Sequence, residues 1–332
     1  MRYLLIRLKD FLIEEPKWIW RWYRPFRFFD KRREKPLYVF MADGKRNHGG
    51  MFDRIKGILT LFALSKVHGA DFKIFFTSPF ELGEYLDVNE YDWKKPAEKL
   101  CYHFPASKPL IVYGECFHPQ RLLRRHKGET HVYYGFDNID MINALYGKDY
   151  EFGSLYRELF KPNKRLQIAL DKMKLTLGDG YIVCHTRFMN LLGDKVEVYG
   201  EGCKVLPEEK RVGLMADCRK AVKHFMDLYK GSHILMATDS EVFSAYIKRE
   251  LPEVMFVEGT VKHIDTMGKT TDEENIKLFL DYYVMAEASR VVSLVGGDLY
   301  PSQFPKYAAR IGGVPFERYI LPGYEDTPWI IQ

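Results

Sequence analysis

Two side chains able to bind an anion or exchange a proton stand two positions apart at the end of an apolar run. His185 and Arg187 follow the sequence Tyr-Ile-Val-Cys, which predicts a buried strand over residues 181–185. Residues two apart on a strand lie on the same face, so both side chains would project together. An arginine placed in this way can form two charge-assisted hydrogen bonds with a diphosphate. A structural ion pair is the alternative for an isolated pair of this kind.

Polar residues also follow two later apolar runs. Asp239 and Ser240 end the run Ile-Leu-Met-Ala-Thr, where they could bind a nucleoside or cap the next helix. Ser302 and Gln303 close a glycine-rich loop ahead of another helix, where a hydroxyl and free N–H groups suit a phosphate, with simple capping as the alternative. Asp281 stands in an otherwise apolar helical stretch, and a buried carboxylate is costly unless it is paired.

A glycine-rich turn near the start of the chain is a further candidate. It ends in Asn47, His48, Gly49 and Gly50, and the helix that follows begins Met-Phe-Asp-Arg54. The two glycines let the backbone approach a ligand, and the helix start offers N–H donors. The turn lacks the Gly-Lys-Ser/Thr ending of a Walker loop and is not a Gly-x-Gly-x-x-Gly fingerprint. A plain strand-to-helix link is the alternative.

These candidates require short parallel strands, each followed by a helix. From residue 181 onward the pattern predicts strands over 181–185, 233–238, 254–257 and 291–295 and helices over 208–229, 241–251, 272–288 and 303–311. The first half predicts strands over 37–41, 72–77, 110–113 and 131–134 and helices over 52–68, 151–160 and 164–177. Such alternation indicates an α/β protein with parallel sheets, in which ligands bind at the carboxyl ends of the strands.

The length and composition of the chain limit its class. A chain of 332 residues exceeds what one hydrophobic core usually serves, so we expect two α/β domains, at 36–165 and 166–332, after a helical segment at 1–35. The five cysteines contain no Cys-x-x-Cys pair, which excludes a zinc ribbon or a thioredoxin-like site. No apolar run approaches the roughly 20 residues that a membrane span needs.

In order and spacing, these motifs resemble those of the fucosyltransferase superfamily, which includes α1,6-, α1,2- and protein O-fucosyltransferases. The matching residues are His185-Thr-Arg187, Ala237-Thr-Asp239, the helix from Leu280-Asp281 to Ala288, the strand Val291–Leu294, Ser302-Gln303 and the turn with Gly49, Gly50 and Arg54. The resemblance implies a GT-B-like fold, with two Rossmann-like domains and a cleft between them. Residues 36–165 would then face the acceptor, and residues 166–332 would bind the nucleotide sugar.

The resemblance also implies roles for individual residues. Arg187 would bind the donor's β-phosphate, Asp239 would lie in the nucleoside pocket, and Ser302 would touch the diphosphate. Asp281 would support the site or contact the nucleotide. The implied reaction is a metal-independent, inverting transfer of fucose or a similar sugar from a nucleotide donor, foremost a GDP-sugar, with no other cofactor.

An acceptor hydroxyl must lose a proton in such a reaction, which requires a base. In the family the base, where one is evident, is an acidic residue after the arginine motif. Here the first acidic residue comes seven positions after Arg187, at Asp194, and Glu197 and Glu201 follow it. We rank Glu201 and Asp194 above Glu197, with His48 as a candidate from the other domain. Each could instead be a solvated loop charge.

Basic charge and aromatic residues concentrate in the first 35 residues. This segment has a net charge of +6 and nine aromatic residues, while the rest of the chain sums to −1. Arginines interleaved with tryptophans favour a membrane surface with anionic headgroups. We therefore expect a peripheral protein on the cytoplasmic, inner face of a membrane, acting on a lipid-linked glycan of capsule, O-antigen or exopolysaccharide synthesis. Packing on the body of the protein, on a second subunit or on nucleic acid are alternatives.

Two other function classes stay open. Asp239 and Glu241 could hold a divalent metal ion in a metal-dependent sugar transferase, although the sequence contains no Asp-x-Asp motif. A non-catalytic polysaccharide-assembly protein could keep the fold without turnover. A dehydrogenase or methyltransferase would lack its expected Gly-x-Gly-x-x-Gly fingerprint.

Overall fold

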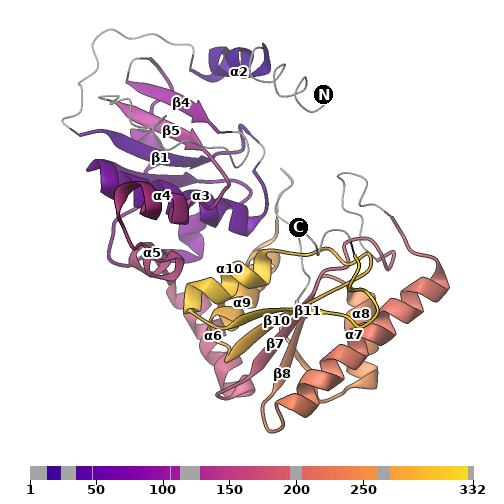
Figure 1. Cartoon of the computed structure of the whole chain (residues 1–332). Coiled ribbons are helices and arrows are strands. Elements are labelled where there is room, and N and C mark those ends of the chain that lie inside the picture. The colour runs from indigo at the N-terminus through magenta and orange to yellow at the C-terminus, as the bar shows by residue number, and fades with distance from the viewer. Residues whose placement is uncertain are drawn as a thin grey trace. The chain divides into compact units, whose positions relative to one another are not determined.

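The computed structural model describes residues 13–23, 35–46, 48–104, 106–112, 128–194, 204–259 and 270–327. These residues divide into two compact units with the boundary between Lys161 and Pro162, which the sequence analysis set between 165 and 166. Each unit has its own parallel β-sheet (Figure 1). None of the helices in these ranges is long and apolar enough to cross a lipid bilayer.

Unit 1 is built on four parallel strands in the order β2-β1-β5-β4. They are β1 (Leu37–Ala42), β2 (Asp71–Phe76), β4 (Ser107–Ile111) and β5 (Glu129–Tyr133). The helix α3 (Met51–His68) connects β1 to β2 and begins at the carboxyl end of β1. The remaining elements are α4 (Ile139–Tyr146), α5 (Phe152–Leu159), the paired strands β3 (Leu86–Val88) and β6 (Phe160–Pro162), and the short 3-10 helices η2 (Leu82–Glu84) and η3 (Ala97–Lys99).

Strand β1 is buried along its whole length because both faces of the sheet are covered. On one face α3 lies so close that a Cβ atom at Gly57 would stand 2.2 Å from the Tyr134 carbonyl oxygen and 3.0 Å from the Phe40 ring. The opposite face carries a cluster against which Trp18 packs, made of Leu37, Val39, Met41, Ile111 and Tyr133. Trp18 belongs to α2 (Glu15–Trp22), which lies across the sheet from α3 and α4 in Figure 1.

Unit 2 contains five parallel strands in the order β11-β10-β7-β8-β9. They are β7 (Ile182–Thr186), β8 (Ile234–Thr238), β9 (Met255–Phe256), β10 (Arg290–Val295) and β11 (Phe316–Ile320). The helices are α6 (Lys164–Leu177), α7 (Glu208–Leu228), α8 (Glu241–Glu250), α9 (Asp272–Ala286) and α10 (Phe304–Gly312). Helices α6, α9 and α10 pack together, and α7 packs with α8, which gives a doubly wound sheet with helices on both faces (Figure 1).

The predicted fold class is confirmed, because both halves of the chain are α/β with parallel sheets. The helix predicted over 164–177 has those bounds in the structure, and the predicted strands of the second half lie within two residues of the observed ones. The strand predicted over 110–113 begins three residues earlier, at Ser107. Helix α4 and strand β11 are not among the predicted elements.

Candidate functional site

The two central strands of unit 2 end side by side where the strand order reverses. β7 and β10 pair in parallel, with His185 opposite Ser293. From β7 the chain moves outward through β8 and β9, then returns to β10 on the other side. In open α/β sheets, ligands bind in the crevice at such a switch point. The candidate site of unit 2 therefore lies at the end of β7 and in the loop 296–303 after β10.

His185 is a buried and neutral imidazole at the end of β7. Only 8% of the residue is exposed, and its ring lies nearly parallel to that of Phe304, with centroids 6.4 Å apart. Burial, and then the charge of Arg187, lower the pKa of His185 to about 3. Within the described ranges no group hydrogen-bonds its Nδ1 atom. The ring is therefore an uncharged neighbour of Arg187 whose Nδ1 is buried and unpartnered among the described residues.

Arg187 lies where the two loops of the switch point meet. Its guanidinium carbon is 5.4 Å from the centre of the Tyr300 ring, and the Tyr300 N–H donates to the Arg187 carbonyl oxygen at 3.0 Å. Ser302 is 4% exposed, and its hydroxyl oxygen accepts the Phe304 N–H at 3.2 Å. The exposed Gln303 is the N-cap position of α10. The structure thus brings the predicted His185, Ser302 and Gln303 to the start of α10, with Arg187 against the loop that leads into it.

Asp239 fixes the loop that follows Arg187. Its Oδ1 accepts the Phe188 N–H and its Oδ2 accepts the Met189 N–H, each at 2.8 Å. Met189 has a φ of 55°, and no other non-glycine residue in the described ranges has a positive φ. The two hydrogen bonds compensate for this unfavourable backbone conformation. The carboxylate predicted to lie in the nucleoside pocket therefore holds the turn beside Arg187.

Asp194 and Ser240 together cap helix α8. The Asp194 Oδ2 atom accepts the Ser240 hydroxyl at 2.6 Å and the Val242 N–H at 2.9 Å, and the Ser240 oxygen accepts the Phe243 N–H at 3.0 Å. A carboxylate at a helix N-terminus is stabilised by the N–H groups and the helix dipole. One oxygen of this candidate base is therefore committed to a structural contact.

Asp281 has the partner that its burial requires. Lys277 lies one helical turn earlier on α9, and its ammonium forms a short ion pair with Asp281. Both residues are less than 8% exposed. A buried carboxylate with a lysine four residues away supports the helix internally.

In unit 1, the glycine-rich turn is held by Arg54. The Arg54 Nε donates to the Gly49 carbonyl oxygen at 3.1 Å, and the guanidinium also bonds the Ser78 carbonyl at the end of β2. Gly50 is the N-cap of α3, and its N–H donates to Asp53 at 3.1 Å. Arg54 is 4% exposed, so it organises the loop from within.

The same turn lines a pocket of about 310 Å³ at the carboxyl ends of β1, β4 and β5. Its walls are Arg46, His48, Gly49, Asp53, Ile111, Val112, Tyr133, Tyr134, Gly135 and Phe136. The His48 ring stacks on Tyr133 with centroids 6.1 Å apart. Burial, and then the charge of Arg54, lower the pKa of His48 to about 4, so the imidazole is neutral at physiological pH.

Three predicted residues lie outside the described ranges, namely Asn47, Glu197 and Glu201. Two residues of the candidate site were not predicted from the sequence. Tyr300 lies against Arg187, and Phe304 lies against His185. Their position in the loop before a predicted helix was the available signal. Glu241, the second ligand of the metal alternative, is exposed at the start of α8, and both oxygens of Asp239 already accept backbone N–H groups.

No protein-family model and no curated protein matches the sequence. Solved structures do match the fold. NodZ α-1,6-fucosyltransferase soaked with GDP-fucose gives a TM-score of 0.54 at 13% identity, over 84% of this chain and 93% of that chain. Fucosyltransferase NodZ from Bradyrhizobium gives 0.54 at 12% identity, over 83% of this chain and 92% of that chain. A mutant of Arabidopsis thaliana FUT1 in complex with GDP gives 0.53 at 14% identity, over 92% of this chain and 73% of that chain. The chain shares its fold with these fucosyltransferases.

Proposed function

We propose that the chain is a glycosyltransferase that moves a hexosyl group, fucose or a similar sugar, from a nucleoside-diphosphate donor to a glycan. The observation that carries this proposal is the contact of Arg187 with Tyr300, in the loop that leads into α10, at the switch point of the unit 2 sheet. The fold is shared with enzymes whose structures hold GDP or GDP-fucose, which makes GDP-fucose the leading donor.

The proposed chemistry follows from the charge of the leaving group. When the glycosidic bond to the diphosphate breaks, negative charge develops on the β-phosphate. The guanidinium of Arg187 and the N–H groups of α10 would stabilise this charge without a metal ion. The neutral His185 would accept or donate one hydrogen bond beside them. An acceptor oxygen attacking the opposite face of the sugar gives inversion, and we assign Glu201 as the base.

A panel of nucleotides tests the donor site directly. GDP, UDP, CMP, dTDP and ADP are each added at saturating concentration, with and without EDTA, and the unfolding midpoint is followed. A ligand at about 100-fold its dissociation constant adds about 2.7 kcal/mol, which shifts the midpoint by several degrees. We expect a shift with GDP that survives EDTA. A shift abolished by EDTA would support the metal-dependent alternative.

Arg187→Ala identifies the residue responsible. We expect this variant to weaken GDP binding by about 1.5–3 kcal/mol, the usual worth of hydrogen bonds to a charged group. Arg249→Ala is the matched control, because Arg249 is exposed on α8 and pairs with Glu250. Equal GDP affinity in the two variants would remove Arg187 from the site. Absence of binding to any nucleotide by the unmodified chain would favour the non-catalytic polysaccharide-assembly protein.

The proposed acceptor is a lipid-linked glycan at the inner face of a membrane, as in capsule or O-antigen synthesis. The support is the net charge of +6 in residues 1–35 and the 66% exposure of Trp20 on α2. Because α2 packs on unit 1, replacing Arg24, Arg27, Arg32 and Arg33 by glutamine is a cleaner test than deleting the segment. We expect weaker binding to vesicles with anionic lipids, about 1 kcal/mol per charge removed. Unchanged sedimentation with such vesicles would contradict the proposal.

A further inference from the structure

Helix α2 packs on unit 1 through particular aromatic side chains. Tyr23, which ends the helix, is 2% exposed, and Trp18 packs on the apolar cluster of β1, β4 and β5. Trp20, between them in sequence, is 66% exposed. One side of α2 is therefore part of the body of unit 1.

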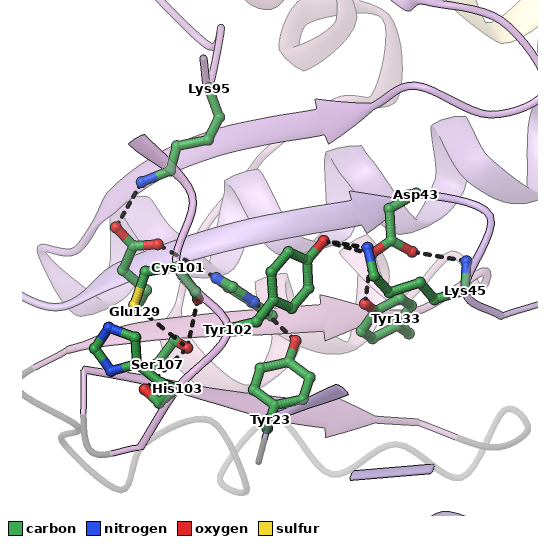
Figure 2. Close-up of polar contacts among 11 residues, drawn as sticks. Tyr23, Asp43, Lys45, Lys95, Cys101, Tyr102, His103, Ser107, Glu129 and Tyr133 are labelled. Carbon is green, nitrogen blue, oxygen red and sulfur yellow. Dashed lines mark hydrogen bonds and ion pairs between the residues drawn. The ribbon is translucent and has the colours of Figure 1, made fainter. Parts of the chain in front are cut away.

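Tyr23 fixes the end of α2 by a buried polar chain (Figure 2). Its hydroxyl lies 2.8 Å from Nδ1 of His131, whose Nε2 lies 3.2 Å from the Glu129 carboxylate. Burial outweighs the influence of Glu129 and lowers the pKa of His131, so the ring is neutral and has one N–H. Because Glu129 accepts from that N–H and from Lys95, Nδ1 must accept the Tyr23 hydroxyl proton.

Trp18 fixes the turn that follows β1. Its Nε1–H donates to the Lys45 carbonyl oxygen at 2.9 Å, and the Arg46 guanidinium carbon lies 5.6 Å from the centre of its ring. Figure 2 shows the side-chain half of the same turn, where Asp43 accepts the Lys45 ammonium at 3.1 Å and the Tyr102 hydroxyl at 2.6 Å. Trp18 of α2 therefore holds the backbone of this turn at Lys45, and Asp43 holds the Lys45 side chain.

Tyr133 connects this turn to the pocket of unit 1. Its ring meets Trp18 edge-on with centroids 5.1 Å apart, and its hydroxyl donates to Asp43 at 3.0 Å. The same ring stacks on His48 and forms a wall of the pocket. Arg46, which lies over Trp18, is another wall. Two of the pocket's walls, Arg46 and Tyr133, thus contact Trp18 of α2, and a third, His48, stacks on Tyr133.

The chemistry of the pocket fits a sugar ring. Its volume of about 310 Å³ is at the small end of the roughly 300–1,000 Å³ typical of small-molecule sites. Tyr133, Tyr134 and Phe136 line the pocket with aromatic side chains suited to the C–H face of a pyranose, and Phe136 is the most exposed of the three. His48 bonds the Met41 backbone with one ring nitrogen, and its Nε2 has no hydrogen-bond partner in the described part of the chain. This nitrogen is buried, and a sugar hydroxyl that reached it would supply its missing hydrogen bond.

We propose that this pocket binds one neutral pyranose ring and that Trp18 of α2 is the residue that positions its walls. The proposal rests on the proposed function for its substrate class, and it gives the N-terminal segment a role in the active centre besides any membrane contact. The ring could come from the acceptor glycan or from the sugar of the donor. The experiment separates these two sources.

The test compares Trp18→Phe with its matched control Trp20→Phe. Trp18→Phe keeps an aromatic ring and removes the donor to Lys45, whereas Trp20→Phe makes the same change at an exposed position of the same helix. Hydrogen exchange of the amides of residues 43–54 is the readout that needs no substrate. We expect exchange there to accelerate about tenfold in Trp18→Phe only, the effect of losing one hydrogen bond of about 1.4 kcal/mol. Equal exchange in the two variants would overturn the positioning role.

Sugar binding is measured with methyl β-D-glycosides of galactose, glucose and N-acetylglucosamine, by saturation-transfer NMR in the presence of GDP. The affinities for GDP and GDP-fucose are measured beside them. His48→Phe keeps an aromatic ring against Tyr133 and removes both ring nitrogens, the one that bonds Met41 and the unpartnered Nε2. We expect about tenfold weaker glycoside binding for an acceptor ring. A loss of affinity for GDP-fucose with unchanged GDP affinity would assign the ring to the donor. If neither affinity changes, the pocket does not bind a pyranose, whatever the outcome of the Arg187 test.

Discussion

We expect opposite effects on kcat when Asp194 and Glu201 are each replaced by the corresponding amide. Asp194→Asn keeps an oxygen for the Val242 N–H and the Ser240 hydroxyl at the start of α8, so we expect kcat within about threefold and a stability loss of about 1 kcal/mol, the usual worth of a cap. Glu201→Gln removes the proposed base, so kcat should fall about 10²–10⁴-fold with GDP affinity unchanged. Sugar transfer to water or to a glycan panel measures both.

Glu197→Gln is the control for this comparison, because it changes the same charge in the same segment as Glu201. If Asp194→Asn lost more than a hundredfold in kcat while keeping its stability, the base would be Asp194. The cap contact would then be a feature of the unliganded chain.

The sequence identified residues at strand ends better than it identified their partners. The apolar run before His185 and Arg187 was enough to place both at the end of a strand, since the periodicity of a buried strand is local. The contact between Asp194 and Ser240 joins residues 46 positions apart, and that between Trp18 and Lys45 crosses 27 positions. Such long-range contacts depend on which elements are neighbours in space, and the local periodicity of the sequence does not predict the order of the strands.

At the scale of elements, the loop after β7 depends on one carboxylate from β8. Asp239→Asn leaves a single acceptor where two N–H groups point, and it turns an NH₂ group toward one of them. Losing a hydrogen bond from a charged group and leaving a buried N–H unsatisfied should cost about 1–3 kcal/mol of stability. Because Arg187 precedes this loop, we also expect weaker GDP binding, measured by calorimetry.

Asp227→Asn is the matched control, since Asp227 makes an exposed pair with Lys223 on α7. It should change stability by less than about 0.5 kcal/mol, as is usual for surface positions. If Asp239→Asn lowered stability but left GDP affinity intact, the loop would not contribute to donor binding.

Two strands that the sequence pattern displaced or did not predict, β4 and β11, share a physical cause. β4 is an edge strand and contains Pro109, which is tolerated at an edge but obscures a strand pattern. β11 is the opposite edge of the other sheet, and its residues are only partly buried, so no apolar run marks it. Central strands such as β1 and β7 are fully buried and gave the clearest signals.

At the scale of the whole molecule, the sequence predicts two alternative roles for the aromatic N-terminal segment. One is a membrane anchor, and the other is a helix packed on the body of the protein. The described part packs on unit 1 through Trp18 and Tyr23, while Trp20 stays exposed. Composition alone could not separate these outcomes, because the same aromatic residues suit a lipid headgroup layer and a sheet face. Membrane association stays a prediction, now attached to a segment that also covers the sheet.

Buried neutral histidines predict how the stability of both units responds to pH. The pKa of His48 is lowered to about 4 and that of His185 to about 3, so between those values and 6.5 the unfolded chain binds more protons than the folded one. Stability should therefore fall on acidification below pH 6.5, by up to about 1.4 kcal/mol per pH unit for each histidine, and be constant with respect to these groups above it.

The carboxylates of Asp43 and Glu129, whose pKa values also lie below normal, act in the same direction only below about their ordinary values of 3.8 and 4.5. Between pH 4.5 and 6.5 these two carboxylates no longer contribute. In unit 1, burial also lowers the pKa values of His68 and His131, which add to the slope of His48, and raises the pKa of Glu81, which opposes it. Urea unfolding followed by hydrogen exchange of peptides from β1 and β7 reports the two units separately. His185→Gln should flatten the response of β7 while β1 keeps its slope, and an unchanged slope at β7 would show that His185 is not the group that titrates.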